Sequence, residues 1–358
     1  MRMSLIRLCI PLILSFSGHA KADDALNPKN GDFVVSNFRL SAGETLPELR
    51  IHYATIGTPR RDRSGHISNA VLLLHSTSLS GSMFLGPNII GTNLAPDLFG
   101  AGQPLDASRY YLIVPDAIGH GRSTKPSDGL RAEFPHYGYD DSVQAEYRLV
   151  TEGLGIDHLR LILGTSMGGM QTWLWGERYP DLMDALMPIA SQPVPIAGRN
   201  FLWRRLVTQA IRNDADWNGG NYAKQPTRWR AVLPVFEIMF SNVAHTQSTA
   251  STAVLSQGLF DRWTGLGKLF DANDVLYQFE SSWDYDPAPG LGKIRAKLLA
   301  LNFADDPINP VETGVMEPAI AKVANGRIVT VAAPADSFGH LNYLHPEIWK
   351  SHLAELLN

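Results

Sequence analysis

The chain has 358 residues, of which 44% are hydrophobic and 18% are charged, and its formal net charge is −4. This length is enough for one large α/β domain with an insertion, and the composition is that of an ordinary globular protein. The small negative charge, without a long run of one sign, argues against a nucleic-acid partner, because binding to phosphates needs a basic face.

Residues 1–22 have the pattern of a secretory signal peptide. A basic start precedes the apolar run Leu8–Phe16, and Ala20-Lys21-Ala22 provides a small-x-small cleavage site. The apolar run is too short to span a bilayer, so we expect no stable membrane insertion after cleavage. Cleavage would remove three positive charges, taking the net charge from −4 to −7, and also Cys9, the only cysteine. We therefore expect a periplasmic or secreted protein without disulfides.

The core region, assigned to residues 23–191 and 287–358, begins with strand patterns. Apolar and polar residues alternate over Asn37–Leu40 and Leu49–Ile56, which predicts antiparallel edge strands. Continuous apolar runs at Ala70–Leu74 and Tyr110–Val114 are typical of strands buried on both faces.

Strands and helices then alternate, which predicts a mostly parallel, doubly wound sheet of the α/β class. Ligand sites in such sheets lie at the carboxyl ends of the strands. The predicted helices begin near Asp140 and cover about Gly168–Tyr179, Val311–Ala324 and His345–Leu357, and the predicted strands are Leu159–Leu163, Ala185–Ile189, Lys297–Leu301 and Arg327–Val331.

Residues 192–286 differ from the rest, since they contain five tryptophans but no long buried strand. We interpret this segment as a helical cap inserted in the core. Most of its aromatic side chains are expected to be packing, and a few to line a pocket for a small-molecule acyl substrate. The sequence leaves the oligomeric state open, with a homodimer as one possibility.

The segment Gly164-Thr165-Ser166-Met167-Gly168 joins a predicted strand to a predicted helix. We interpret it as a tight turn that holds Ser166 in a strained conformation as a nucleophile, with the two glycines avoiding collisions. The backbone N–H of Met167 would then face a developing oxyanion. A glycine-rich turn with an incidental serine is the alternative, and the flanking strand and helix argue against it.

A serine hydroxyl needs a base to take its proton, and the base needs an acid to orient it. His340 follows the last predicted strand and is the expected base, with Gly339 leaving room for its approach to Ser166. Asp306 follows an earlier predicted strand and is the expected acid. Asp305 is its rival, and His345 competes with His340 but suits a helix start better.

A second oxyanion donor is expected from the loop after the strand Ala70–Leu74. We assign it to the backbone N–H of Thr77, with Ser76 and Ser78 as alternatives. His75 is expected to hold this loop in shape.

The sequence predicts neither a cofactor nor a metal ion. It contains no His-Glu-x-x-His motif, and its histidines show no ligand spacing. Gly100-Ala101-Gly102 and Gly119-His120-Gly121 do not form a dinucleotide-binding fingerprint.

These motifs resemble the α/β-hydrolase superfamily, and within it the homoserine O-acetyltransferase-like branch. The resemblance covers most of the mature chain and implies an α/β-hydrolase fold with a Ser166, Asp306 and His340 triad. The segments that carry it are Tyr53–Thr58, Leu105–Tyr110, Gly119–Ser123, Gly164–Gln171, Asp216–Tyr222 and Gly339-His340.

Two departures argue against acetyltransferase activity. The resemblance implies an Asp directly after the catalytic histidine and an arginine in the cap, but here Leu341 and Ala231-Val232-Leu233-Pro234 stand instead. A zwitterionic substrate would lose two charge-assisted bonds, each worth roughly 1.5–3 kcal/mol. We therefore expect a secreted serine esterase working through an acyl-enzyme. An acyltransferase with the same triad, and a binding module without activity, are the alternatives.

Overall fold

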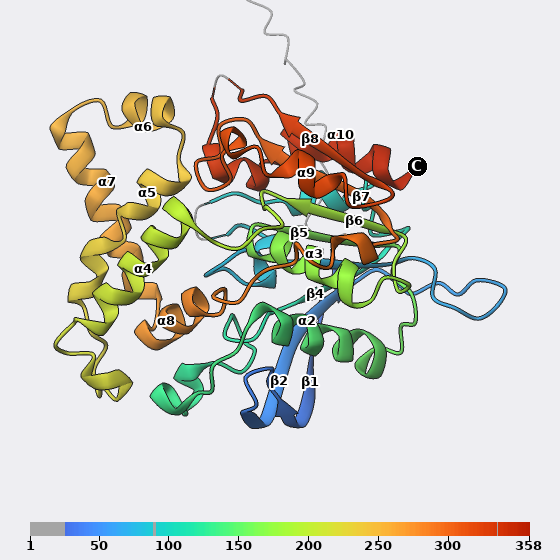
Figure 1. Cartoon of the computed structure of the whole chain (residues 1–358), viewed down its shortest axis with the longest axis horizontal. Coiled ribbons are helices and arrows are strands. Elements are labelled where there is room, and N and C mark those ends of the chain that lie inside the picture. Colours follow the sequence, from blue (N-terminus) through green and yellow to red (C-terminus); the bar gives the residue numbers. More distant parts are fainter. Residues whose placement is uncertain (1–25, 89–90, 335) are drawn as a thin grey trace, which may run out of the picture.

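The computed structural model describes residues 26–88, 91–334 and 336–358, and the predicted signal peptide lies outside them. Its strands are β1 Lys29–Arg39, β2 Thr45–Ile56, β3 Ala70–Leu74, β4 Tyr111–Pro115, β5 Leu161–Thr165, β6 Ala185–Ile189, β7 Lys297–Phe303 and β8 Gly326–Val331. They form one sheet in the order β1-β2-β4-β3-β5-β6-β7-β8 (Figure 1). Only the pairs β1–β2 and β2–β4 are antiparallel, which confirms the predicted mostly parallel sheet.

The strands form where the apolar pattern is strongest. Every residue of β3, β5 and β6 is buried, since helices cover both faces of the sheet at these strands. In the edge strand β1, exposed and less exposed positions mostly alternate. β1 and β2 begin earlier than predicted, because a long antiparallel ladder from Lys29↔Thr55 to Arg39↔Thr45 also includes polar residues.

Two layers of helices sandwich the sheet. Leu72 of β3 belongs to an apolar core with Trp173, whereas its neighbour Leu73 belongs to another with Leu98 and Trp349. Adjacent strand residues thus face opposite layers. The first layer includes α2 Tyr139–Arg148, α3 Met167–Arg178 and α9 Met316–Ile320, and the second includes α1 Ala95–Phe99 and α10 Pro346–Leu357.

The helix predicted over Val311–Ala324 is too long. Only α9, Met316–Ile320, is α-helical there, and a 3₁₀ turn, Val311–Thr313, precedes it. Gly314 has φ +60°, in the left-handed region, and ends this turn. The glycine therefore separates two short pieces that the apolar spacing had joined.

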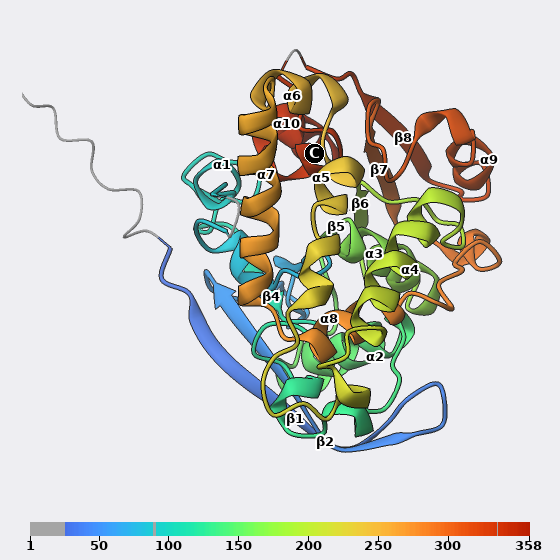
Figure 2. The ribbon, with the colours of Figure 1, turned by 90° about the vertical axis from the view of Figure 1, so that its left-hand side faces the viewer.

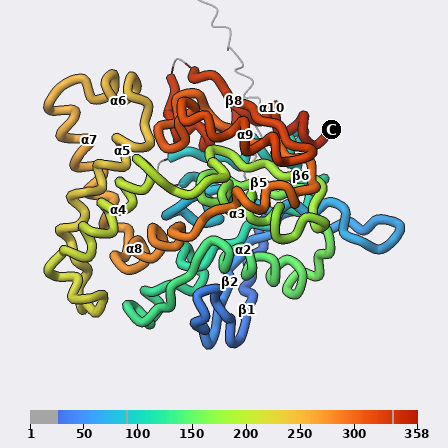
Figure 3. The backbone as a smooth tube through the Cα atoms, viewed as in Figure 1, coloured from blue at the N-terminus to red at the C-terminus, as the bar shows by residue number. Residues whose placement is uncertain are grey.

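Five α-helices and no strand lie between β6 and β7. Figures 1 and 2 show α4, α5, α6 and α7 standing together at one side of the sheet. The connection 57–69, which is exposed over residues 57–66, projects from the opposite side (Figure 3). We call the helices between β6 and β7 the cap helices, while the limits 192–286 stay a prediction. They are α4 Gly198–Arg212, α5 Val235–Phe240, α6 Val243–Thr249, α7 Ala253–Leu266 and α8 Ala272–Glu280.

The cap tryptophans differ in burial. Trp203 and Trp229 are 4% and 1% exposed, whereas Trp283 is 58% exposed. Within the described ranges, no helix has the length and apolar character needed to cross a membrane.

Glu146 of α2 is buried in the first helical layer, where its Oε2 accepts a hydrogen bond from Trp175 Nε1 of α3 at 3.0 Å. Burial raises the pKa of Glu146 from 4.5 to about 8. Between these values the folded protein keeps a proton that the unfolded chain has released. The free energy of unfolding therefore falls as the pH rises through this window, and this contribution levels off above about pH 8.

We expect Glu146→Gln to remove this dependence, because glutamine can accept the same hydrogen bond without a charge. The unfolding free energy of the variant minus that of wild type should increase by up to about 1.4 kcal/mol for each pH unit that the pH rises across the window. Urea unfolding at pH 5 and pH 8 measures it, with the exposed Glu48→Gln as control. A gap of the same size at both pH values would contradict the prediction.

Candidate active site

Ser166 lies at the sharp turn between β5 and α3. Its φ of 53° and ψ of −110° are strained for a residue with a side chain. Its N–H donates to the Ile189 carbonyl of β6 at 2.9 Å, which ties down the turn. A Cβ on Gly164 would lie 2.0 Å from the Gly168 carbonyl oxygen, and one on Gly168 would lie 2.1 Å from the Leu74 carbonyl oxygen. The turn therefore requires both glycines, as predicted.

The structure brings the three predicted triad residues together. Ser166 Oγ lies 2.9 Å from His340 Nε2, and His340 Nδ1 lies 2.8 Å from Asp306 Oδ2. The His340 and Asp306 side chains are 3% and 0% exposed. Because Nδ1 faces a carboxylate, we assign the ring proton to Nδ1, so that Nε2 accepts the hydrogen bond from the serine hydroxyl.

Asp306 is held by its own loop, which follows β7. Its Oδ1 accepts hydrogen bonds from the N–H groups of Ile308 at 2.8 Å and Asn309 at 3.1 Å. Its Oδ2 accepts another from Asn309 Nδ2 at 2.9 Å, beside the bond from His340. These bonds fix the carboxylate with one oxygen toward the imidazole.

The two rivals lie elsewhere. Asp305 Oδ2 accepts hydrogen bonds from Ser337 Oγ at 2.6 Å and Asn242 Nδ2 at 2.5 Å, so it links loops rather than contacting His340. His345 precedes α10, as predicted, and stacks on Phe338 with ring centroids 4.0 Å apart.

Gly339 has a different role from the one predicted. Its φ is +62°, and an added Cβ would lie 2.6 Å from the Phe240 carbonyl oxygen and 2.8 Å from the Asn242 nitrogen. The missing side chain thus makes room for the chain after α5, rather than for Ser166. This close contact joins the His340 turn to the cap helices.

Two backbone N–H groups are available near Ser166. Met167 is the first residue of α3, and Thr77 lines the same pocket as Ser166. Within the described ranges, neither N–H donates a hydrogen bond. The side chain of Ser76 is engaged, since its Oγ lies 2.9 Å from Thr165 Oγ1. The oxyanion assignments to Met167 and Thr77 stay predictions.

His75 fixes the loop that carries Thr77. It is 1% exposed, its Nε2 accepts a hydrogen bond from Ala117 N at 3.0 Å, and its Nδ1 donates to the Ser76 carbonyl at 2.9 Å. Burial lowers the pKa of His75, which keeps the ring neutral and able to accept. The histidine thus ties the loop after β3 to the loop after β4, which confirms the expected role.

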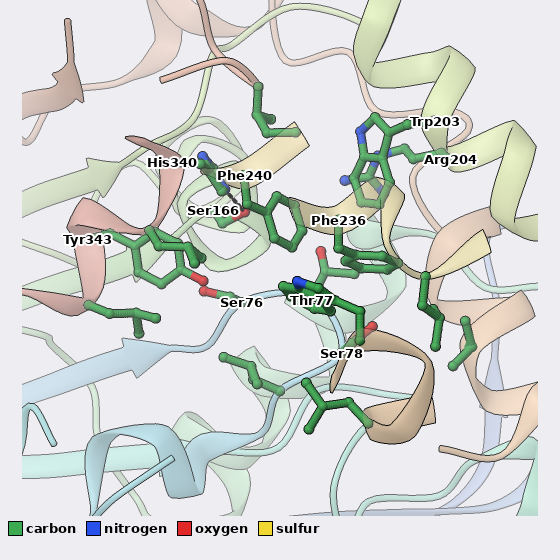
Figure 4. Close-up of a pocket in the computed structure, with 18 of the residues that line it drawn as sticks. Ser76, Thr77, Ser78, Ser166, Trp203, Arg204, Phe236, Phe240, His340 and Tyr343 are labelled. Carbon is green, nitrogen blue, oxygen red and sulfur yellow. Dashed lines mark hydrogen bonds between the residues drawn. The ribbon is translucent and has the colours of Figure 1, made fainter. Parts of the chain in front are cut away.

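A largely apolar pocket opens above Ser166, between the sheet and the cap helices (Figure 4). It holds about 990 Å³, open solvent included. Leu341 and Leu233 both line it, so the two departures noted in the sequence face the same space. The other lining residues are Ser76, Thr77, Ser78, Leu79, Ser166, Met170, Trp203, Arg204, Phe236, Phe240, Trp263, Leu266, Phe270, Val275, Ile308, His340, Tyr343 and Leu344.

Arg204 in this wall was missed by the sequence reasoning. A signal existed, because Arg204 shares helical spacing with Val207, Thr208 and Ile211, all of which are buried. A cation on that face is unusual.

Over the described ranges, no cluster of three or more His, Cys, Asp or Glu side chains could hold a metal ion.

The fold and the Ser166, His340 and Asp306 arrangement are those of the α/β-hydrolase class. A family model described as the alpha/beta hydrolase fold matches residues 69–319, and the chain belongs to this family. The crystal structure of esterase E22 shares the fold, with a TM-score of 0.80, 19% identity, and coverage of 92% of this chain and 100% of that one.

Within the superfamily, the chain belongs to the homoserine O-acetyltransferase-like branch. The homoserine O-acetyltransferase of Gluconobacter oxydans is 34% identical over 359 residues, covering 87% of this chain and 88% of that protein. That of Thermobifida fusca is 34% identical over 198 residues, covering 52% of this chain and 50% of that protein. The chain spans about half the length of this relative and of similar ones. It is an enzyme of the α/β-hydrolase superfamily.

Proposed function

We propose that the chain is a periplasmic or secreted serine hydrolase that cleaves a carboxylic ester. The observation that carries the proposal is the hydrogen-bonded series Ser166–His340–Asp306 at the floor of an apolar pocket. The pocket suits the apolar part of a small acyl substrate. The predicted signal peptide is the basis for the location.

In the proposed reaction, Ser166 Oγ attacks the ester carbonyl carbon while His340 Nε2 takes the hydroxyl proton. Asp306 stabilises the imidazolium, and the N–H groups of Met167 and Thr77 hold the oxyanion. The intermediate collapses, and the departing alcohol takes the proton from His340. Water then attacks the acyl-enzyme with His340 as base, which releases the acid and restores Ser166.

An acyltransferase with the same acyl-enzyme is the second candidate. It is supported by the similarity to the Gluconobacter oxydans homoserine O-acetyltransferase over most of both chains. Hydrolysis is favoured because Leu341 and Leu233 line the pocket and, within the described part of the chain, no acidic residue does. A substrate ammonium group would have no carboxylate to bind there.

Product analysis distinguishes the two candidates. We expect the purified mature protein to release acetate from p-nitrophenyl acetate at a rate that homoserine leaves unchanged. Mass spectrometry of the products, with and without homoserine, tests this. O-acetylhomoserine as the main product would contradict hydrolysis and support the second candidate.

A further inference from the structure

Arg204 is a buried cation without an acidic partner. Its residue is 7% exposed, and within the described ranges no carboxylate forms an ion pair with it. Its Nε donates to Asn200 Oδ1 at 2.9 Å, and a terminal nitrogen donates to Ser282 Oγ at 3.1 Å. A guanidinium has five N–H donors, so three remain without an acceptor among the described residues. An arginine is always charged, and a buried charge without a partner is costly.

Arg204 lies between two hollows, because it lines the pocket above Ser166 and also a smaller hollow that Phe279 and Ser282 line. It packs against the rings of Trp203 and Phe279, with centroid distances of 5.4 and 5.5 Å. These cation–π contacts offset part of the desolvation cost. Figure 4 shows Trp203 and Arg204 on α4, across the pocket from Ser166 and His340.

Arg204 adds a positive charge to the lining of the pocket above Ser166. Among the described lining residues it is the only one with a permanent charge, and the rest of the lining is mostly apolar. Electrostatic attraction is strong in such surroundings because little water screens it. The pocket is therefore suited to a ligand that joins an apolar chain to an anionic end.

We propose that Arg204 binds a carboxylate of the substrate, and that the enzyme prefers esters carrying a second, free carboxylate. The planar fork of a guanidinium matches the two oxygens of a carboxylate. Since no acidic side chain among the described lining residues could hold an ammonium, the substrate class is a monoanionic ester, such as a half-ester of a dicarboxylic acid. This inference rests on the proposed esterase function.

A kinetic comparison tests the preference. We expect Arg204→Met, which keeps an unbranched side chain but removes the charge, to lower the ratio of kcat/KM for monoethyl glutarate to that for ethyl pentanoate. The drop should be at least about tenfold, or about 1.4 kcal/mol. The control is Arg205→Met, an exposed neighbour on α4 that stacks on Trp283 and does not line this pocket. An unchanged ratio in Arg204→Met, or an equal drop in Arg205→Met, would overturn the proposal.

A binding measurement separates this inference from the esterase proposal. Calorimetry should show that pentanoate binds wild type at least about tenfold more tightly than Arg204→Met. Pentanamide, which lacks the charge, should bind the two proteins with similar affinity. If wild type cleaves no ester but binds pentanoate in this way, the esterase proposal fails and the carboxylate site stands. Equal pentanoate affinity in both proteins would refute the site.

Discussion

Ser166→Ala is expected to lower ester turnover by at least about 10⁴-fold, because no other group is proposed to form the acyl-enzyme. The hydroxyl contacts His340 Nε2 at 2.9 Å and is partly exposed to the pocket. Removing the hydroxyl leaves the strained turn and the glycines around it unchanged. The loss should therefore be chemical, with the thermal unfolding midpoint preserved.

Labelling with a fluorophosphonate probe provides the second measurement. Wild type should react at one serine, which peptide mapping would place at Ser166, and Ser166→Ala should not react. The control is Ser82→Ala, since Ser82 is exposed on the short helix after β3 and its hydroxyl lies 2.8 Å from that of Ser80, away from His340. Wild type that fails to react would favour a binding module without activity. Full activity in Ser166→Ala would remove the nucleophile assignment.

Much of the core was predictable because it depends on local pattern. Strands buried on both faces consist of apolar residues, so the predicted Ala70–Leu74 and Ala185–Ile189 match β3 and β6 at both ends. The meeting of Ser166, His340 and Asp306 was predictable because the tight turn demands glycines and the loops after later strands meet at one sheet edge. The ends of the edge strands β1 and β2 depend on strand pairing, and the shortness of α9 depends on the conformation of Gly314. The spacing of apolar residues reports neither.

The pocket was less predictable, since it depends on how the cap helices pack over the sheet. The family resemblance implies a substrate-binding arginine near Leu233, but the sequence has none at that place. The structure places Leu233 in the pocket but adds Arg204 from the cap helix α4. The reason for Gly339 was also missed, because its close neighbour Phe240 lies about a hundred residues earlier in the chain. Both features require contacts between distant segments.

Asp306→Asn is expected to lower kcat by roughly 10³–10⁴-fold while the protein stays folded. Asp306 Oδ2 accepts hydrogen bonds from His340 Nδ1 and Asn309 Nδ2. An amide nitrogen at this position would donate instead, so the imidazole would have to carry its proton on Nε2. It could then no longer accept the hydrogen bond from Ser166. Steady-state kinetics measures the loss, and circular dichroism checks the fold.

Asp305→Asn is the matched control, because it makes the same chemical change one residue earlier. Asp305 accepts hydrogen bonds from Ser337 and Asn242, so its replacement should weaken the link between two loops. We expect a loss of roughly 1.5–3 kcal/mol in unfolding free energy, with kcat within about tenfold of wild type. Asp306→Asn should act mainly on turnover, because its carboxylate touches the imidazole, whereas Asp305→Asn should act mainly on stability. Equal losses of kcat in the two variants would mean that Asp306 has no orienting role beyond holding its loop.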